Sequence, residues 1–141
     1  MLEQVTSSIE FNFVIDLLLA LFCGLVIGSE RELKKKPAGI STQTLVITGS
    51  MMFAFLSQTV GEGDPTRIAA QIVSGIGFLG AGIILKSESK KTVTNVTTAA
   101  SIWYSAAVGM ALGFNFHIIA VIASLYAVLI SRIPRLNQSD D

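Results

Sequence analysis

Long apolar runs separated by short polar stretches dominate the pattern of hydrophobic and polar positions along the chain. Five such runs are present, and each is close to the roughly 20 residues that a helix needs to cross a bilayer. The pattern predicts an all-α membrane protein, a bundle of about five transmembrane helices. The predicted spans are Phe11–Gly28, Ile40–Val60, Pro65–Leu85, Val96–Gly113 and Phe116–Ile133. Only two residues separate the last two spans, so a tight hairpin must join them.

Composition supports this class of protein. Of 141 residues, 51% are hydrophobic and 14% are charged, and the mean hydropathy is +0.64. A formal net charge of zero gives no reason to expect nucleic acid as a partner. The single cysteine, Cys23, lies inside an apolar run, where a thiol behaves as a small hydrophobic side chain. No nucleophile–base pair, metal cluster or phosphate loop is visible, so we expect neither an enzyme nor a cofactor.

Basic residues predict the orientation in the membrane. With five spans, the first loop, the third loop and the C-terminal tail lie on the same side of the membrane. Together they hold nine of the ten lysines and arginines: Arg31, Lys34, Lys35 and Lys36; Lys86, Lys90 and Lys91; Arg132 and Arg135. The positive-inside rule then places the N-terminus outside and the C-terminus in the cytoplasm. Residues 1–10 would be an extracytoplasmic segment, 11–133 the transmembrane domain and 134–141 a short cytoplasmic tail. The three consecutive lysines could also form a patch for anionic lipid or a partner, although a solvated topogenic cluster is the simpler interpretation.

Small residues recur at helical spacing in several of the predicted spans. Helices in lipid associate through small side chains that let their backbones approach. Two such stripes predict packing faces: Ala20, Gly24 and Gly28 in the first span, and Ser101, Ser105, Gly109 and Gly113 in the fourth.

An intramembrane polar cluster is predicted at the outer end of the bundle. The first small-residue stripe, extended back by one turn, reaches Asp16, and Arg67 enters the third span from the same side with Gln71 and Ser74 after it. A lone charge in a bilayer needs a partner, so we expect Asp16 and Arg67 to pair. Two interpretations of this cluster remain open. It is either an ion pair that only fixes the register of the helices, or a site near Asp16 that binds a cation or proton. The lone histidine, His117, gives no transition-metal site.

The third span begins in an unusual way and is rich in glycine. Asp64 followed by Pro65 predicts a helix start, because the carboxylate can cap free N–H groups and proline suits the first helical turn. Four glycines then remove side chains from the second half of the span: Gly75, Gly77, Gly80 and Gly82. A membrane helix tolerates this where another backbone or a cavity comes close.

Polar residues also flank the spans on the predicted cytoplasmic side. Glu30 and Glu32 either hold the lysines of the third loop or are solvated, and we favour solvation. Thr97, Thr98 and Ser101 open the fourth helix, where their hydroxyls either cap its free N–H groups or form hydrogen bonds between helices, and we favour capping.

Three motifs resemble those of the MgtC/SapB family of bacterial membrane proteins. They are GLVIGSERE (Gly24–Glu32), DPTRIAAQIVSGIGFLGAG (Asp64–Gly82) and TTAASIWYSAAVGMALG (Thr97–Gly113). The resemblance implies a multi-pass protein of the bacterial inner membrane connected with low magnesium, acid stress or survival inside host cells. It implies a regulatory role, including contact with the F-type ATP synthase in some members, rather than proven magnesium transport. The family's functional positions carry over as Asp16, Glu30, Arg31, Asp64, Arg67 and the run from Gly75 to Gly82.

The chain departs from the family pattern at two places. Ser41 precedes Thr42 where the family usually has an arginine before the threonine, so an ion pair of that arginine with Glu30 is not expected. Many members also carry a cytoplasmic regulatory domain after the fifth helix, whereas this sequence ends at Asp141.

These observations favour a non-enzymatic inner membrane protein that modulates ion homeostasis through contacts with other membrane proteins. A small-cation transporter or channel for magnesium or protons, built on the Asp16 and Arg67 cluster, is the alternative. A purely structural assembly subunit is a third interpretation. Exposed packing stripes on short helices also predict a homo-oligomer, most simply a twofold dimer.

Overall fold

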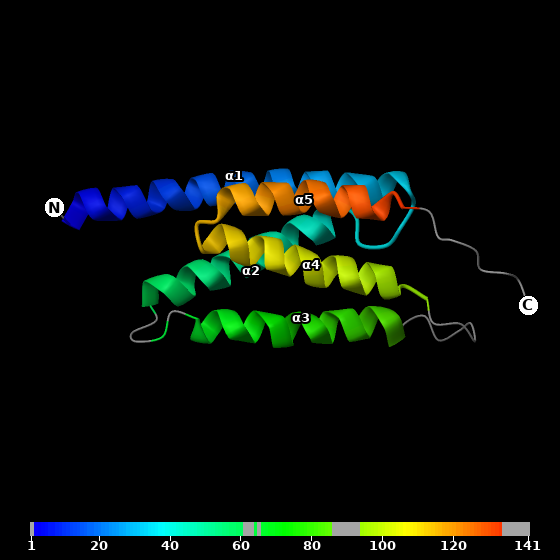
Figure 1. Ribbon diagram of the computed structural model, residues 1–141. Coiled ribbons are helices and arrows are strands. Elements are labelled where there is room, and N and C mark those ends of the chain that lie inside the picture. The colour runs from blue at the N-terminus through cyan, green and yellow to red at the C-terminus, as the bar shows by residue number, and fades with distance from the viewer. Residues whose placement is uncertain (1, 61–63, 65, 86–93, 134–141) are drawn as a thin grey trace, which may run out of the picture.

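The computed structural model of the chain describes residues 2–60, 64, 66–85 and 94–133. These residues form five α-helices that run alternately up and down the bundle (Figure 1). The helices are α1 (Leu2–Leu33), α2 (Ile40–Val60), α3 (Arg67–Leu85), α4 (Val96–Gly113) and α5 (His117–Ser131). The prediction of an all-α bundle is confirmed.

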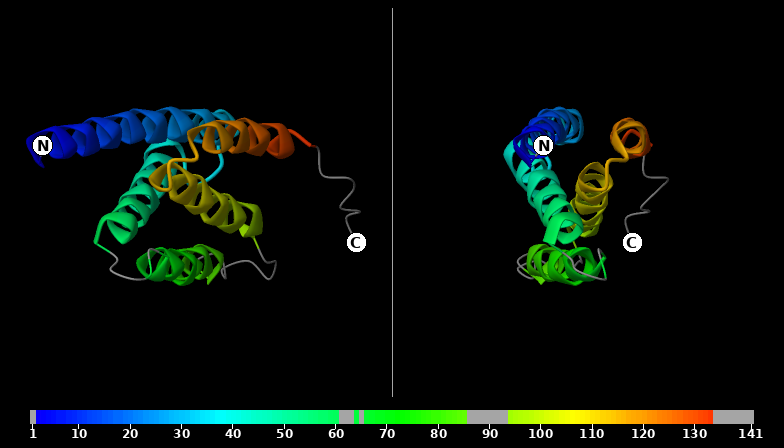
Figure 2. Two further views of the ribbon diagram at one scale, coloured as in Figure 1. Left: turned by 60° about the vertical axis from the view of Figure 1, so that its left-hand side comes forward. Right: turned by 90° about the vertical axis from the view of Figure 1, so that its left-hand side faces the viewer.

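The helices are arranged in three layers. α1 and α5 lie side by side at one side of the bundle, α2 and α4 cross in the middle, and α3 lies at the opposite side (Figures 1 and 2). α3 contacts α2 and α4, but within the described residues it does not contact α1 or α5. The central pair therefore separates α3 from the other outer helices.

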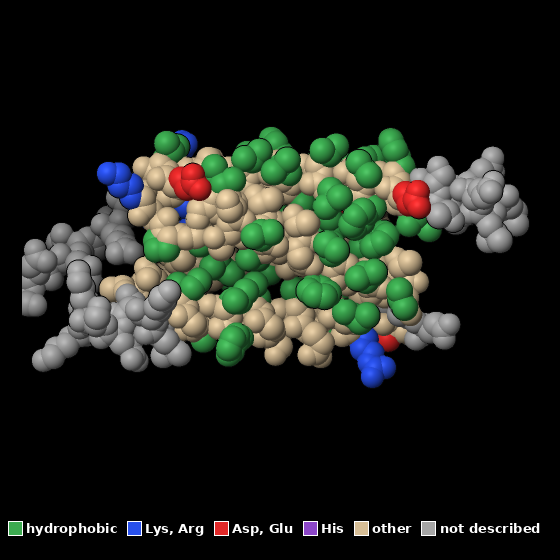
Figure 3. Space-filling model, turned by 180° about the vertical axis from the view of Figure 1, so that it is seen from behind, with side chains coloured by type: hydrophobic (Ala, Val, Ile, Leu, Met, Phe, Trp, Pro, Cys, Tyr) green, Lys and Arg blue, Asp and Glu red, His purple; other side chains and the backbone are tan. Residues whose placement is uncertain are grey.

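Length and apolar character qualify four helices of the described chain as membrane spans. The spans are Ile9–Leu33, Ile40–Val60, Arg67–Ile84 and Val96–Gly113. The helix His117–Ser131 is apolar but shorter. Seen from behind, hydrophobic side chains cover the middle of the molecule and charged ones gather toward its two ends (Figure 3). This distribution suits a protein that crosses a bilayer several times.

Helix bounds differ from the predicted spans where polar residues extend or shorten a helix. α1 begins at Leu2, ahead of the predicted Phe11, because main-chain hydrogen bonds continue through polar residues that hydropathy does not count. α5 covers only His117–Ser131 of its predicted range. The predicted tight hairpin is present: Asn115 is left-handed with φ 62°, and the Phe116 N–H donates to the Ala111 carbonyl over 2.8 Å.

Glycines bring the backbones of α1 and α4 onto α2. A Cβ atom on Gly109 or Gly113 of α4 would overlap the carbonyl oxygens of Ile47 and Met51, respectively. On α1, a Cβ on Gly24 would come within 2.7 Å of the Thr44 Cα atom. Such contacts are shorter than van der Waals distance, so only glycine fits at these crossings.

Apolar side chains fill the space on either side of these crossings. One buried cluster joins α1, α2, α4 and α5: Ala20, Cys23, Ile27, Ile47, Met51, Val108, Leu112 and Ala120. A second joins α2, α3 and α4: Ala54, Ala69, Ile72, Ile76, Ile102 and Ala106. α2 and α4 contribute to both clusters, which makes them the core of the bundle.

Alanine substitutions at two glycines, one packed and one exposed, test the close crossing of α4 on α2. Gly109→Ala should destabilise the bundle by about 1–3 kcal/mol, because the added methyl group must push α4 away from α2. Gly77→Ala is the matched control, since a Cβ there meets nothing within 4 Å, and it should be neutral or slightly stabilising. Unfolding in mixed micelles, followed by circular dichroism, measures both. Equal unfolding midpoints for the two variants would contradict the backbone contact.

Candidate functional site

A polar network lies inside the bundle where α2 meets α4. The side chain of Gln43 is fully buried. Its amide donates to the Ala38 carbonyl over 3.1 Å and to the Ser101 hydroxyl over 3.2 Å. The Ser105 hydroxyl donates to Gln43 Oε1 over 2.6 Å. Both ends of the amide are therefore satisfied, as burial in an apolar bundle requires.

Arg31 joins the end of α1 to the turn before α2 and to the start of α4. Its side chain is 3% exposed. Nε donates to the Pro37 and Ala38 carbonyls over 2.9 and 3.0 Å, and Nη2 donates to Pro37 over 2.6 Å and to Thr98 Oγ1 over 2.8 Å. Thr98 was expected to cap α4, but its hydroxyl accepts this bond between helices instead.

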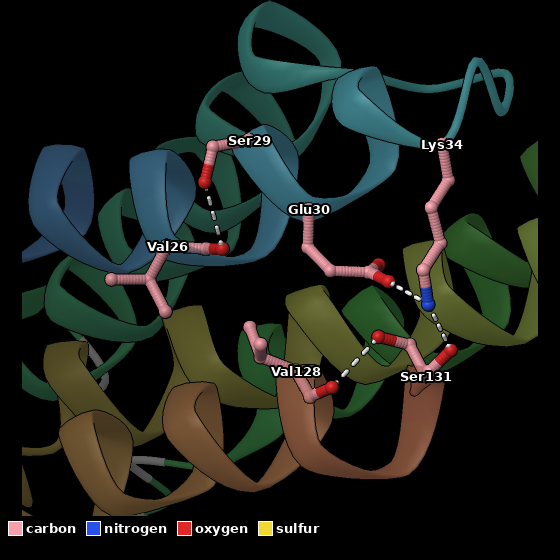
Figure 4. A network of polar contacts seen from close by, with 6 residues as sticks. All are labelled: Val26, Ser29, Glu30, Lys34, Val128 and Ser131. Carbon is pink, nitrogen blue, oxygen red and sulfur yellow. Dashed lines mark hydrogen bonds and ion pairs between the residues drawn. The ribbon is translucent and has the colours of Figure 1, made fainter. Parts of the chain in front are cut away.

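Glu30 and Lys34 connect α1 to the end of α5. Lys34 Nζ lies 2.5 Å from Glu30 Oε1 and donates to the Ser131 carbonyl over 2.7 Å (Figure 4). Glu30 is only 7% exposed, so the expectation of a solvated carboxylate is wrong for this residue. Glu32 Oε1 instead accepts a hydrogen bond from the Ile40 N–H over 2.9 Å, which caps the start of α2. The third-loop lysines lie outside the described residues.

Near the middle of α1, Asp16 lies against the start of α5. The carboxylate is 2% exposed, and its Oδ1 lies 2.7 Å from Nε2 of His117. The bond forms either with an N–H on Nε2 donating to an ionised carboxylate or with a protonated Asp16 carboxyl donating to Nε2. The partner of Asp16 thus comes from the first residue of α5, 101 positions later in the chain.

The structure does not bring Arg67 to Asp16. Arg67 is exposed at the start of α3, and α1 and α3 make no contact in the described part of the chain. The prediction that Asp16 pairs with Arg67 rested on their similar depth in the membrane. It is wrong because α2 and α4 lie between α1 and α3. Gln71 and Ser74 are likewise exposed on α3, away from Asp16.

Asp64 shapes the approach to α3. Its Oδ1 accepts hydrogen bonds from the Thr66 N–H over 3.0 Å and from the Thr66 hydroxyl over 2.7 Å. These bonds hold the pKa of the exposed Asp64 carboxyl below its ordinary value. Pro65 lies outside the described residues, and the helix itself begins at Arg67.

The glycines of α3 face open space. A Cβ atom on Gly75, Gly77 or Gly82 would meet nothing within 4 Å, and one on Gly80 would meet only the Ala99 Cβ at 3.6 Å. This contrasts with the glycines of α1 and α4, which touch the backbone of α2. Within the single chain, the α3 glycines are therefore not needed for packing.

Sequence reasoning missed Gln43, Lys34, Ser131 and His117 as parts of these contacts. A signal existed for Gln43, an amide inside an apolar span and one helical turn before the buried Ile47. The sequence places His117 at the hairpin between the last two spans, but it does not indicate that α1 lies opposite this residue. No group of three His, Cys, Asp or Glu side chains in the described ranges is arranged to hold a metal ion.

Fold and network together define an α-helical, multi-pass membrane protein with charged and amide side chains bonded between its helices. The sequence matches the profile of the MgtC family over residues 17–138. The chain belongs to the MgtC family, which confirms the resemblance that the three motifs indicated.

Curated relatives agree with this assignment. The chain is 41% identical over 133 residues to Protein MgtC of Salmonella typhimurium, covering 91% of this chain and 57% of the relative. Protein MgtC of Brucella abortus is 44% identical over 117 residues, 82% of this chain and 48% of the relative. An uncharacterized protein of Haemophilus influenzae is 41% identical over 132 residues, with 86% and 55% covered. The chain spans about half the length of these relatives, and no solved structure matches it.

A double-mutant cycle tests the Asp16 contact. Asp16→Ala and His117→Ala should each destabilise the protein, because the remaining partner loses its hydrogen bond inside the bundle. The double variant should be less destabilised than the sum of the singles, with a coupling of about 1–3 kcal/mol. The matched cycle of Asp16→Ala with Arg67→Ala should be additive. Unfolding in mixed micelles measures all the variants, and coupling in the Arg67 cycle alone would contradict the observed arrangement.

Proposed function

We propose that the protein is a non-enzymatic membrane protein of the bacterial inner membrane that modulates ion homeostasis or stress adaptation. It would act through contacts with other membrane proteins rather than by transporting an ion. Family membership supports the connection with limiting magnesium, acid stress and survival inside host cells that the resemblance implies. The F-type ATP synthase is a candidate partner on the same ground.

The outer face of α3 carries this proposal. Besides the exposed Val73, Phe78 and Leu79, this face carries many small side chains: Ala70, Ser74, Gly75, Gly77, Ala81 and Gly82. Ala70, Ser74, Gly77 and Ala81 follow one another at spacings of four, three and four, so they share one stripe of the helix. A stripe of this kind lets a second helix approach closely in lipid.

The exposed face of α5 shows what a lipid-facing helix of this protein looks like. It carries large apolar side chains: Ile118, Ile119, Ile122, Leu125 and Leu129, each between 54% and 76% exposed. α3 also exposes the large side chains of Phe78 and Leu79, at 82% and 52%, but it differs from α5 in the small side chains that lie beside them. Small side chains on α3 favour contact with protein, and the same face suits a twofold dimer of this chain.

The transporter alternative has less support. Asp16 lies near the middle of α1, where His117 of α5 contacts it, and Arg31 lies fifteen residues further along α1, about 22 Å at the rise of an α-helix. Before Glu30, the buried side chains of α1 along this stretch are apolar: Ala20, Cys23 and Ile27. Over this stretch α1 therefore offers an ion no charged side chain, although a charge is most costly in the middle of the bilayer.

Substitutions on the small face of α3 test the proposed contacts. Ser74→Leu and Gly77→Leu should abolish complementation of a strain that lacks the gene, during growth at limiting magnesium or acid pH. A leucine side chain holds a partner helix away but meets nothing in the single chain. Ile122→Phe on α5 is the control and should complement fully. Immunoblots of membranes establish equal abundance.

Two results would contradict the proposal. One is full complementation by both α3 variants at normal abundance. The other is sustained magnesium or proton flux through the purified protein alone in liposomes, abolished by Asp16→Asn in a folded variant. That second result would favour the transporter.

We propose the orientation that the positive-inside rule predicts, with the basic ends of α1 and α5 in the cytoplasm. Single cysteines at Lys35 and Arg132, in a Cys23→Ser background, should resist an impermeant maleimide in intact cells. A cysteine at Asp64 should react, because it lies at the opposite end of the bundle. Labelling at Lys35 from outside would invert the topology.

A further inference from the structure

A pocket of about 340 Å³ lies between α1, α4 and α5, at the end of the bundle that carries Arg31. We call it the α4–α5 pocket. Polar side chains line one part of it, among them Arg31, Lys36 and Thr97, and apolar ones line another part, among them Tyr126 and Ile130. Its volume is within the roughly 300–1,000 Å³ typical of small-molecule sites.

The polar part of the pocket carries an excess of positive charge, because Arg31 and Lys36 line it together with one carboxylate, Glu30. Lys34 lies 2.5 Å from that carboxylate and neutralises it. Arg31 uses Nε and Nη2 for its hydrogen bonds, and Nη1 donates to none of the described residues. Lys36 likewise forms no ion pair within the described ranges, and its side chain is half-buried. Two cationic groups are therefore available to an anion.

The apolar part of the pocket reaches the surface that faces lipid. Tyr126 is 54% exposed, Ile130 44% and Ile133 62%, and all three line the pocket. An acyl chain could leave the pocket along these side chains without crossing polar surface. A soluble anion would gain nothing from this apolar wall, whereas a lipid would bury its tail against it.

We propose that the α4–α5 pocket binds an anionic phospholipid. The phosphate group lies between Arg31 and Lys36 and accepts a hydrogen bond from the Thr97 hydroxyl, and the acyl chain follows Tyr126 and Ile130. Arginine and lysine between transmembrane helices are the groups that recognise such headgroups. The site is independent of the partner contacts proposed for α3, because it lies on other helices.

Native mass spectrometry of the purified protein, titrated with phosphatidylglycerol, tests the site. Lys36→Gln should weaken binding about five- to tenfold, as expected for loss of one cation at a phosphate. Lys35→Gln is the matched control: it removes the same charge one residue away, does not line the pocket, and should change affinity by less than about twofold. Lys36→Arg should retain binding. The unfolding midpoint of each variant in the same detergent verifies its fold.

Further arms of the titration identify the kind of ligand. Phosphatidylcholine should bind more weakly than phosphatidylglycerol, because its headgroup has no net charge. Ala127→Leu fills part of the apolar wall and should weaken phosphatidylglycerol binding, whereas soluble glycerol 3-phosphate should not displace the lipid. Equal effects of Lys36→Gln and Lys35→Gln would overturn the site as non-specific charge. Full displacement by glycerol 3-phosphate, or no effect of Ala127→Leu, would overturn it as a lipid site.

Discussion

Direct backbone contact between α2 and its two neighbours is the constraint on which the rest of this structure depends. In lipid, no hydrophobic driving force brings helices together, so association needs close packing and bonds between helices. Gly109 and Gly113 of α4 lie against main-chain carbonyls of α2, and Gly24 of α1 lies against Thr44 of the same helix. α2 is thereby held between α1 and α4, and its other contacts follow from that position.

The polar network depends on this closeness and in turn fixes its register. Ser105 reaches Gln43 over 2.6 Å only because α4 lies on α2. Arg31 ties the turn between α1 and α2 to Thr98 of α4. Hydrogen bonds between membrane helices contribute about 0.6–2 kcal/mol each, but a slip by one residue would leave buried donors and acceptors without partners. The network therefore selects one arrangement among the many that small residues alone would allow.

The exterior of the bundle is divided between two kinds of surface on opposite sides. α5 presents large apolar side chains and borders the α4–α5 pocket. α3 lies across the bundle from α5 (Figure 2) and exposes glycine, alanine and serine beside Phe78 and Leu79. Because α2 and α4 separate these sides, a lipid and a protein partner can be bound at the same time.

The sequence by itself determined the class of protein, the bounds of α2 and α4, and the hairpin at Asn115. These features follow from local hydropathy and from backbone preferences within one segment, so a single sequence is sufficient for them. The motifs also determined the family. Tertiary structure alone decided which polar groups meet: Asp16 faces His117 and not Arg67, and Gln43 joins Ser105. Helical periodicity gives each residue a face and a depth, but only the packing of the helices decides which neighbour stands opposite at that depth.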